Sequence, residues 1–249
     1  MPKTCIIIPC YNEEKRFDEK EFSDFFQVDD DTHFYLVNDG STDETLDLLN
    51  KVKNKIGDRV RILHLKKNKG KAEAVRIGML SALSWMNFDY FGYFDADFSA
   101  PLNQISLLVN IMEEKHGGCH AIFGSRILYL NNVIKRKAWR HYGGRIFAVI
   151  ADRMLDLSIY DTQCGAKIFS RDIINNIFLE PFRSRWLFDI EIILRLRNIY
   201  GKQELKNLII EFPLHVWKEK GDSKISMFDI VKIPYELLKI YYYYGKEAS

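Results

Sequence analysis

Two carboxylates set one residue apart are the clearest chemical feature of this chain. The apolar pair Tyr93-Phe94 is followed by Asp95-Ala96-Asp97. Residues at i and i+2 of a strand point to the same face, so a strand ending here would offer two oxygen ligands to one divalent cation. Magnesium or manganese held by one or two carboxylates keeps positions for the oxygens of a substrate diphosphate. The pattern also suits a polar strand end followed by a turn, because Asp, Ser and Pro favour loops.

The Asp pair follows one of five predicted strands. Runs rich in Ile, Val, Tyr and Phe predict strands at residues 3–9, 33–37, 59–65, 90–94 and 120–123. Helical stretches lie between these runs. This alternation predicts an α/β fold in which a mostly parallel sheet carries helices on both faces.

Polar segments follow the first four of these strands. They comprise residues 9–14, 38–41, 68–71 and the Asp pair. Because ligands of such sheets bind beyond the carboxyl ends of the strands, the four segments should meet at one binding edge. Each segment alone is explained equally well by turn chemistry, but four at one edge favour a site.

Three helices have recognisable starts. Ser41 and Glu44 have the spacing of a capping box and precede apolar residues at helical spacing. A second helix is predicted over about residues 70–86 and a third from Pro101, since proline suits the first helical turn.

Lys69 and Lys71 flank the start of the second predicted helix. The helix dipole disfavours cations there by roughly 0.3–1 kcal/mol, so the two lysines indicate a phosphate or nucleotide contact. The alternative is a pair of solvated lysines on a loop.

Length and composition limit the class of protein. The chain has 249 residues, 47% hydrophobic and 28% charged, which suits one large domain or a domain with a modest extension. A net charge of +2 argues against a nucleic-acid binder. There is no secretory signal and no apolar run approaching the ~18 residues of a membrane span, which predicts a cytoplasmic protein. The four cysteines lack zinc-type pairing and are expected to be buried thiols.

Three motifs resemble the hallmarks of the large inverting glycosyltransferase family that binds nucleotide sugars on a GT-A fold. They are residues 6–14 (IIIPCYNEE), 37–43 (VNDGSTD) and 95–97 (DAD). Within that family the chain is most similar to the branch of dolichyl-phosphate glucosyltransferases and polyprenyl-phosphate sugar transferases. The segments that carry this likeness are 68–76 (NKGKAEAVR), 124–126 (GSR), 161–169 (DTQCGAKIF), 185–191 (RWLFDIE) and 223–224 (SK). The resemblance implies a GT-A domain over residues 1–225 and a C-terminal helical extension over residues 226–249.

The resemblance also implies a donor site for a nucleoside diphosphate sugar, with UDP-glucose favoured. Asp95 would reach the ribose or the metal, and Asp97 would ligate a Mg²⁺ or Mn²⁺ cofactor. That cation would neutralise the departing nucleoside diphosphate. The residues expected to bind the base, ribose or diphosphate are Pro9, Tyr11, Glu13, Asp39 and Lys71.

On the acceptor side, the resemblance implies Asp189 as the catalytic carboxylate. Arg126, Ser223 and Lys224 are expected to contact phosphate of the donor or the acceptor. If the acceptor is a hydroxyl, Asp189 would act as a base. If it is a lipid monophosphate, whose second pKa is about 6, the nucleophile is already ionised and Asp189 would position another group. The structural alternative is a carboxylate favoured by a helix N-terminus.

The chain departs from the family pattern in two respects. Relatives that transfer mannose to a lipid phosphate often carry Gln just after the Asp pair as a further metal ligand, whereas this chain has Phe98 and Ser99. Close eukaryotic relatives also have an N-terminal membrane anchor and other members have C-terminal spans, neither of which is recognisable here. Both departures weaken the case for a lipid acceptor more than the case for the chemistry.

Two segments could replace an anchor and hold the protein peripherally at the inner face of a membrane. Residues 135–141 form a basic cluster around Trp139, as expected of a surface that meets anionic headgroups. Residues 227–244 are apolar and aromatic with scattered lysines, and could form an interfacial helix kinked at Pro234. In the alternative, which is slightly favoured, Leu237, Leu238 and Tyr241 cover the protein's own core.

These features predict metal-dependent, inverting transfer of a sugar, with glucose favoured, to a polyprenyl or dolichyl phosphate. Transfer to a hydroxyl of a polysaccharide or glycan is the alternative within the same chemistry. A nucleotidyltransferase, which would attack phosphorus and release pyrophosphate, and a non-enzymatic nucleotide-sugar-binding protein are the alternatives from other classes.

Overall fold

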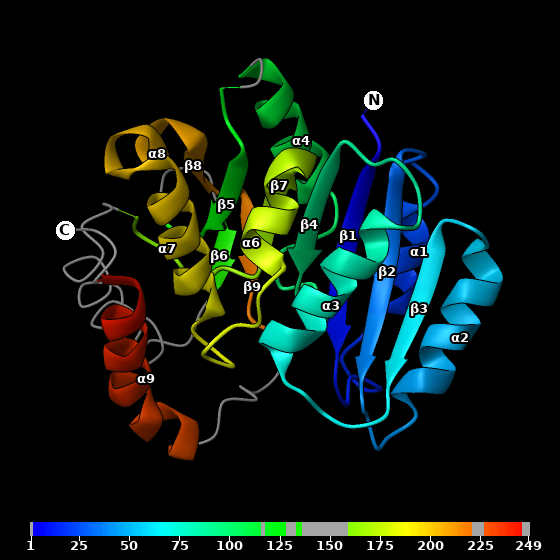
Figure 1. Cartoon of the computed structure of the whole chain (residues 1–249). Helices are drawn as coiled ribbons and strands as arrows, with labels where there is room; N and C mark the ends of the chain where they lie inside the picture. Colours follow the sequence, from blue (N-terminus) through cyan, green and yellow to red (C-terminus); the bar gives the residue numbers. More distant parts are fainter. Residues whose placement is uncertain (1, 116–117, 128–132, 136–158, 221–226, 246–249) are drawn as a thin grey trace.

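The computed structural model describes residues 2–115, 118–127, 133–135, 159–220 and 227–245. Its centre is a seven-stranded sheet with the strand order β3-β2-β1-β4-β7-β5-β8 (Figure 1). Neighbouring strands pair in parallel except at β7, which is antiparallel to both β4 and β5. The strands are β1 (Thr4–Cys10), β2 (Thr32–Asp39), β3 (Val60–Leu65), β4 (Tyr90–Phe94), β5 (Ala121–Ser125), β7 (Ala166–Ser170) and β8 (Ile209–Pro213).

Helices pack on both faces of this sheet, so the predicted α/β fold with a mostly parallel sheet is confirmed. One face carries α1 (Glu19–Phe25), α2 (Thr45–Ile56) and α4 (Gln104–Glu114). The other face carries α3 (Lys71–Leu83), the 3₁₀ turn η1 (Arg171–Ile173), α6 (Ile174–Phe178), α7 (Phe188–Tyr200), α8 (Lys202–Leu208) and α9 (Met227–Gly245). A small parallel pair, β6 (Val133–Lys135) and β9 (Val216–Lys218), completes the described elements.

The core lies in two layers because both faces of the sheet are covered. In β1, Cys5 and Ile7 pack under α3, while Ile6 and Ile8 pack toward α1 and α2. Strands buried on both faces are continuous apolar runs, which explains why these strands could be predicted from the sequence. The four cysteines are buried thiols, as expected.

Two predicted helix starts were wrong. The N–H of Asn12 donates to Ser41 Oγ at 3.0 Å, and α2 begins at Thr45, whose N–H donates to the Asp43 carboxylate at 3.1 Å. The predicted capping box therefore does not form, because Ser41 instead ties the loop after β2 to the loop after β1. The third helix, α4, begins at Gln104, and Pro101 lies in a turn before it.

The C-terminal segment forms the helix α9, which contains Pro234 and packs beside α7 (Figure 1). Leu237 is buried against the core, as the core-packing alternative expected. Leu238 and Tyr241 are 54% and 48% exposed, so for these two residues that alternative was wrong. Of the helices in the described ranges, none combines the length and hydropathy that crossing a bilayer requires. The division of the chain at residue 225 stays a prediction.

Candidate active site

The carboxyl ends of three parallel strands bring the predicted donor residues to one edge of the sheet. Residues 9–13 extend from the end of β1, Asp39 ends β2, and Asp95 and Asp97 follow β4. The starts of two helices complete the group, since Lys71 begins α3 and Asp189 lies in the first turn of α7. The edge predicted from the strand order is therefore the edge at which these residues lie.

Lys71 links the carboxylates that follow β4 to the start of α7. Its ammonium is 2.6 Å from Asp95 Oδ1, and its side chain is 23% exposed. Burial alone would lower the pKa of Lys71, but the charges of Asp95 and Asp189 raise it above its ordinary value. Lys71 therefore stays protonated between two carboxylates that lie far apart in the sequence.

Asp189 is buried, with 3% of its surface exposed. Its Oδ1 accepts a hydrogen bond from Lys167 Nζ at 2.6 Å and another from the hydroxyl of Tyr93. Burial first, and then the Asp189 charge, raises the pKa of Tyr93 well above its usual value. The phenol therefore stays protonated and donates this hydrogen bond. One oxygen of Asp189 is thus held by two protein donors.

Asp95 lies directly over a glycine. A Cβ at Gly165 would lie 1.9 Å from Asp95 Oδ2, and the Asp95 N–H donates to the Gly165 carbonyl at 3.0 Å. Any side chain at residue 165 would displace the carboxylate. Gly165, at the turn before β7, therefore fixes where Asp95 lies.

The donor set at Asp95 and Asp97 fits a divalent cation that takes its other ligands from a diphosphate. The Ser99 N–H donates to Asp97 Oδ1 at 3.0 Å, and both carboxylates are half-exposed at the sheet edge. Burial and then the charge of Asp95 raise the pKa of Asp97, as expected for a partly buried carboxylate beside a like charge. Phe98, the residue that follows the Asp pair, is buried and its side chain offers no metal ligand. Within the described ranges, no cluster of three or more His, Cys, Asp and Glu side chains is arranged as a complete metal site.

Asp39 organises a loop as well as lying at the predicted base site. Its Oδ1 accepts from the Lys69 N–H at 2.7 Å, and its Oδ2 accepts from the Gly70 N–H at 2.8 Å and from Asn68 Nδ2 at 3.0 Å. The carboxylate is 2% exposed. Asp39 therefore shapes the loop that precedes Lys71, and its direct contact with a base stays a prediction.

The other predicted donor residues lie on the strand end that faces this loop. Glu13 is 4% exposed and receives Arg16 Nε at 2.8 Å and Nη2 at 2.9 Å. Tyr11 is 36% exposed and Pro9 is half-buried. Tyr11 is thus accessible to a flat base, whereas Glu13 is already engaged by a cation.

Arg126, predicted to contact phosphate, is engaged by a protein carboxylate. Its Nε and Nη2 lie 2.6 and 2.7 Å from the two oxygens of Asp161. Burial alone would raise the pKa of Asp161, but Arg126 holds it below the ordinary value. This bidentate pair gives Arg126 a structural role, and its phosphate contact stays a prediction. Ser223 and Lys224 lie outside the described residues, as do residues 136–141 of the basic cluster.

Three residues that contact the site were missed by the sequence reasoning. Lys167 and Tyr93 hold Asp189, and Arg185 donates to Asn68 Oδ1 at 2.6 Å from a segment 117 residues away. A Cβ at Gly70 would lie 2.5 Å from Arg185 Nε, so the guanidinium rests on the loop that Asp39 shapes. The position of Lys167 inside the apolar run of β7 was the sequence feature that could have indicated a buried, paired lysine.

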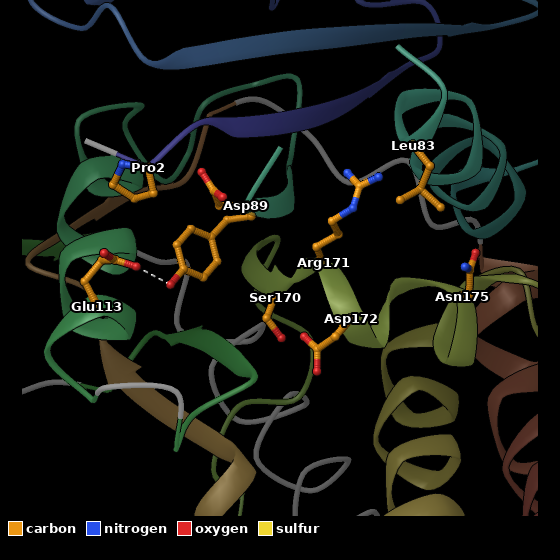
Figure 2. A pocket seen from close by; sticks show the side chains of 9 residues that line it. Pro2, Leu83, Asp89, Glu113, Ser170, Arg171, Asp172 and Asn175 are labelled. Atoms are coloured by element: carbon orange, nitrogen blue, oxygen red, sulfur yellow. Dashed lines mark hydrogen bonds between the residues drawn. The ribbon is translucent and has the colours of Figure 1, made fainter. Parts of the chain in front are cut away.

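A pocket of about 820 Å³ lies at the opposite edge of the sheet (Figure 2). Pro2 precedes β1, Tyr90 begins β4 and Ser170 ends the antiparallel β7, which places the pocket away from the carboxylates. The Tyr90 hydroxyl bonds to Glu113 across it. None of the predicted site residues that the structure describes lines this pocket.

The chain is similar in sequence to glycosyltransferases. Residues 5–178 match the profile of "Glycosyl transferase family 2". A human dolichyl-phosphate beta-glucosyltransferase is 30% identical over 90% of this chain and 69% of its own length. The Saccharomyces cerevisiae protein of that name is 29% identical over 94% of this chain and 73% of its own length.

The fold is that of GT-A glycosyltransferases. A glucosyl-3-phosphoglycerate synthase from Mycobacterium tuberculosis, solved with Mn²⁺, UDP-glucose and phosphoglyceric acid, superposes with a TM-score of 0.69. It is 16% identical, and the match covers 96% of this chain and 80% of that one. A structure of the same enzyme with Mg²⁺ and UDP gives a TM-score of 0.66.

The Asp39 contacts generate a prediction about the loop at residues 68–70. Asp39→Ala removes the acceptor of the Lys69 and Gly70 N–H groups, so both amides should exchange faster with solvent, as measured by hydrogen exchange.

Asp43→Ala is the matched control, because Asp43 accepts backbone N–H groups of Glu14 and Thr45 at the same sheet edge but not those of the loop at residues 68–70. Unchanged exchange at Lys69 and Gly70 in the folded Asp39→Ala variant would refute the role given to Asp39.

Proposed function

Because the chain belongs to glycosyl transferase family 2, we propose that it transfers glucose from UDP-glucose to a polyprenyl or dolichyl phosphate, with inversion at the anomeric carbon. The observation that carries the proposal is the gathering of Asp95, Asp97, Lys71 and Asp189 at one sheet edge. The names of the relatives support the sugar and the lipid phosphate. The UDP-glucose and Mn²⁺ bound by the structural neighbour support the donor and the cofactor.

In this proposal the residues after β4 handle the departing nucleotide. Asp95 and Asp97 would hold a Mg²⁺ or Mn²⁺ ion, which supplies positive charge where the diphosphate leaves. Lys71, protonated and 2.6 Å from Asp95, adds a second positive charge at the same place. Tyr11 and the loop that Asp39 organises would bind the uridine.

The environment of Asp189 supports a phosphate acceptor. Its Oδ1 already accepts hydrogen bonds from Lys167 and Tyr93, which suits a carboxylate that orients its neighbours better than one that collects a proton. A lipid monophosphate is largely a dianion at neutral pH, because its second pKa is about 6, and needs no base. In this proposal Asp189 positions Lys71, whose pKa it helps to raise.

The test is a turnover assay with purified protein, UDP-glucose, Mg²⁺ or Mn²⁺, and a short polyprenyl phosphate. We expect UDP release together with a glucosylated lipid, and loss of both with EDTA or in Asp97→Asn. Asp89→Asn, at the pocket on the opposite edge, is the matched control and should keep full activity.

Other outcomes of this assay identify the alternatives. Turnover that requires a glycan in place of the lipid would show a hydroxyl acceptor. Pyrophosphate release from a nucleoside triphosphate and a sugar phosphate would show a nucleotidyltransferase, and donor binding without turnover would show a binding protein. Full activity in EDTA would refute the metal mechanism.

Asp189→Asn separates the two acceptor classes. With a phosphate acceptor the loss in kcat should stay below the ~10²–10⁴-fold typical of a lost general base, because the nucleophile is already ionised. The rate should also follow the ionisation of the acceptor near pH 6. The measurement is kcat against pH for both proteins. A deep loss that recovers steadily through alkaline pH, with donor binding intact, would establish a hydroxyl acceptor instead.

We further propose that α9 meets a membrane surface that carries anionic headgroups. Tyr235, Leu238 and Tyr242, which share one side of the helix, are 69%, 54% and 66% exposed. The exposed Lys232 and Lys239 lie beside them, and lysine is attracted to anionic lipid by about 1 kcal/mol per residue. Tyrosines with adjacent lysines are the composition of interfacial helices.

This surface predicts a lipid-dependent association. The double variant Leu238→Glu/Tyr242→Glu should lose co-flotation with vesicles that contain phosphatidylglycerol, because two negative charges replace the outward apolar groups. Val28→Glu is the control, because Val28 is an apolar residue that is 86% exposed elsewhere. Equal flotation of wild type and double variant would refute the proposal, as would a concentration-dependent dimer that the double variant abolishes.

A further inference from the structure

We propose that Lys167 is a positioning residue for the transfer reaction. Its buried ammonium holds the Asp189 carboxylate and residues 162–164 in one relative geometry, and this geometry sets the rate of the chemical step. The inference rests on the proposed function and assigns a role to a side chain that touches no substrate.

The ammonium of Lys167 is fully occupied by the protein. Nζ donates to the carbonyls of Thr162 at 3.0 Å and Cys164 at 2.7 Å, and to Asp189 Oδ1 at 2.6 Å. A lysine ammonium has three N–H donors, and all three are used. The side chain has no exposed surface. Lys167 therefore acts on reactants only through the groups that it holds.

The neighbouring strands fix the direction of this side chain. In the sheet Lys167 pairs with Tyr93 on one side and Phe123 on the other. Its Nζ lies 5.4 Å from the Tyr93 ring centroid and 4.9 Å from that of Phe123. Tyr93 also donates to the same oxygen of Asp189. Asp189 Oδ1 is thus held from two adjacent strands, which leaves Oδ2 as the oxygen that can face reactants.

The carbonyls that Lys167 holds belong to the segment that supports Asp95. Gly165, one residue after Cys164, accepts the Asp95 N–H at 3.0 Å and leaves room for its carboxylate. Asp161, one residue before Thr162, holds Arg126 in a bidentate pair. The Lys167 ammonium therefore connects Asp189 to the segment that supports Asp95. Loss of this connection should change the position of one carboxylate relative to the other.

The experiment is a double-mutant cycle on the transfer reaction. Lys167→Met keeps the length of the apolar stem and removes the charge. We expect kcat to fall by about 10–100-fold, the usual cost of removing a group that orients a functional side chain from behind. The KM for the sugar nucleotide should not change, because the base and ribose residues are untouched. In the Asp189→Asn background Lys167→Met should cost much less, because coupled residues are non-additive.

Arg195→Met is the matched control. Arg195 is another buried cation that donates to main-chain carbonyls, those of Ile177, Glu180 and Pro181, and it does not contact Asp189. It should destabilise the fold without coupling to Asp189→Asn. If Lys167→Met does not fold, Tyr93→Phe removes the other donor to the same oxygen and should lower kcat without changing KM.

The wild-type assay tests the proposed function by itself, and the variants are compared on whichever sugar nucleotide and acceptor the wild type uses. Lys167→Met with full kcat would overturn the inference. If the losses caused by Lys167→Met and Asp189→Asn simply multiply, or if KM rises together with the loss of kcat in Lys167→Met, the role of Lys167 is purely structural and the inference is overturned as well.

Discussion

The structure of the site depends on how three carboxylates are held at one edge of the sheet. Asp95, Asp97 and Asp189 would repel one another if they were gathered without compensation, because like charges in a partly buried site disfavour ionisation. Two lysines from separate elements lie among them. Lys71 at the start of α3 contacts Asp95, and Lys167 in β7 contacts Asp189. Removing one partner of the buried Lys167–Asp189 pair would leave an uncompensated charge, so the folding of the site depends on its charge balance.

This constraint explains the antiparallel strand β7, the one break in an otherwise parallel sheet. Because β7 lies between β4 and β5, Lys167 emerges beside Tyr93 and beneath the start of α7. The turn before β7 also brings Gly165 under Asp95. A helical crossover to a parallel strand would bring the chain into β7 from the far edge of the sheet, and this turn could not then lie at the edge that holds Asp95 and Asp97.

Much of the fold and the location of the site could be predicted from the sequence, because both follow from local patterns. Strands covered on two faces are apolar runs, and polar segments at their carboxyl ends meet at one edge. The errors arose where a residue serves a distant partner. Ser41 has the spacing of a helix cap but accepts the Asn12 N–H from the neighbouring loop.

Lys167 was missed for the same reason. A lone lysine in an apolar strand gives no indication that its partner is a carboxylate 22 residues further on. Asp39 was recognised as a polar residue at the binding edge and Arg126 through the family resemblance, but their loop and ion-pair contacts depend on segments 30 and 35 residues away. Patterns read along the chain identify which residues face a site, whereas the partners of those residues are set by the packing of elements.

The charge balance also bears on the choice of acceptor. A hydroxyl acceptor brings no charge, whereas a phosphate dianion brings negative charge and needs nearby cations. Asp189 has one oxygen held by Lys167 and Tyr93, and the cations Lys71, Arg16 and Arg185 all interact electrostatically with carboxylates of this edge. These charges support the proposed phosphate acceptor, because nearby cations would offset the negative charge that a phosphate brings.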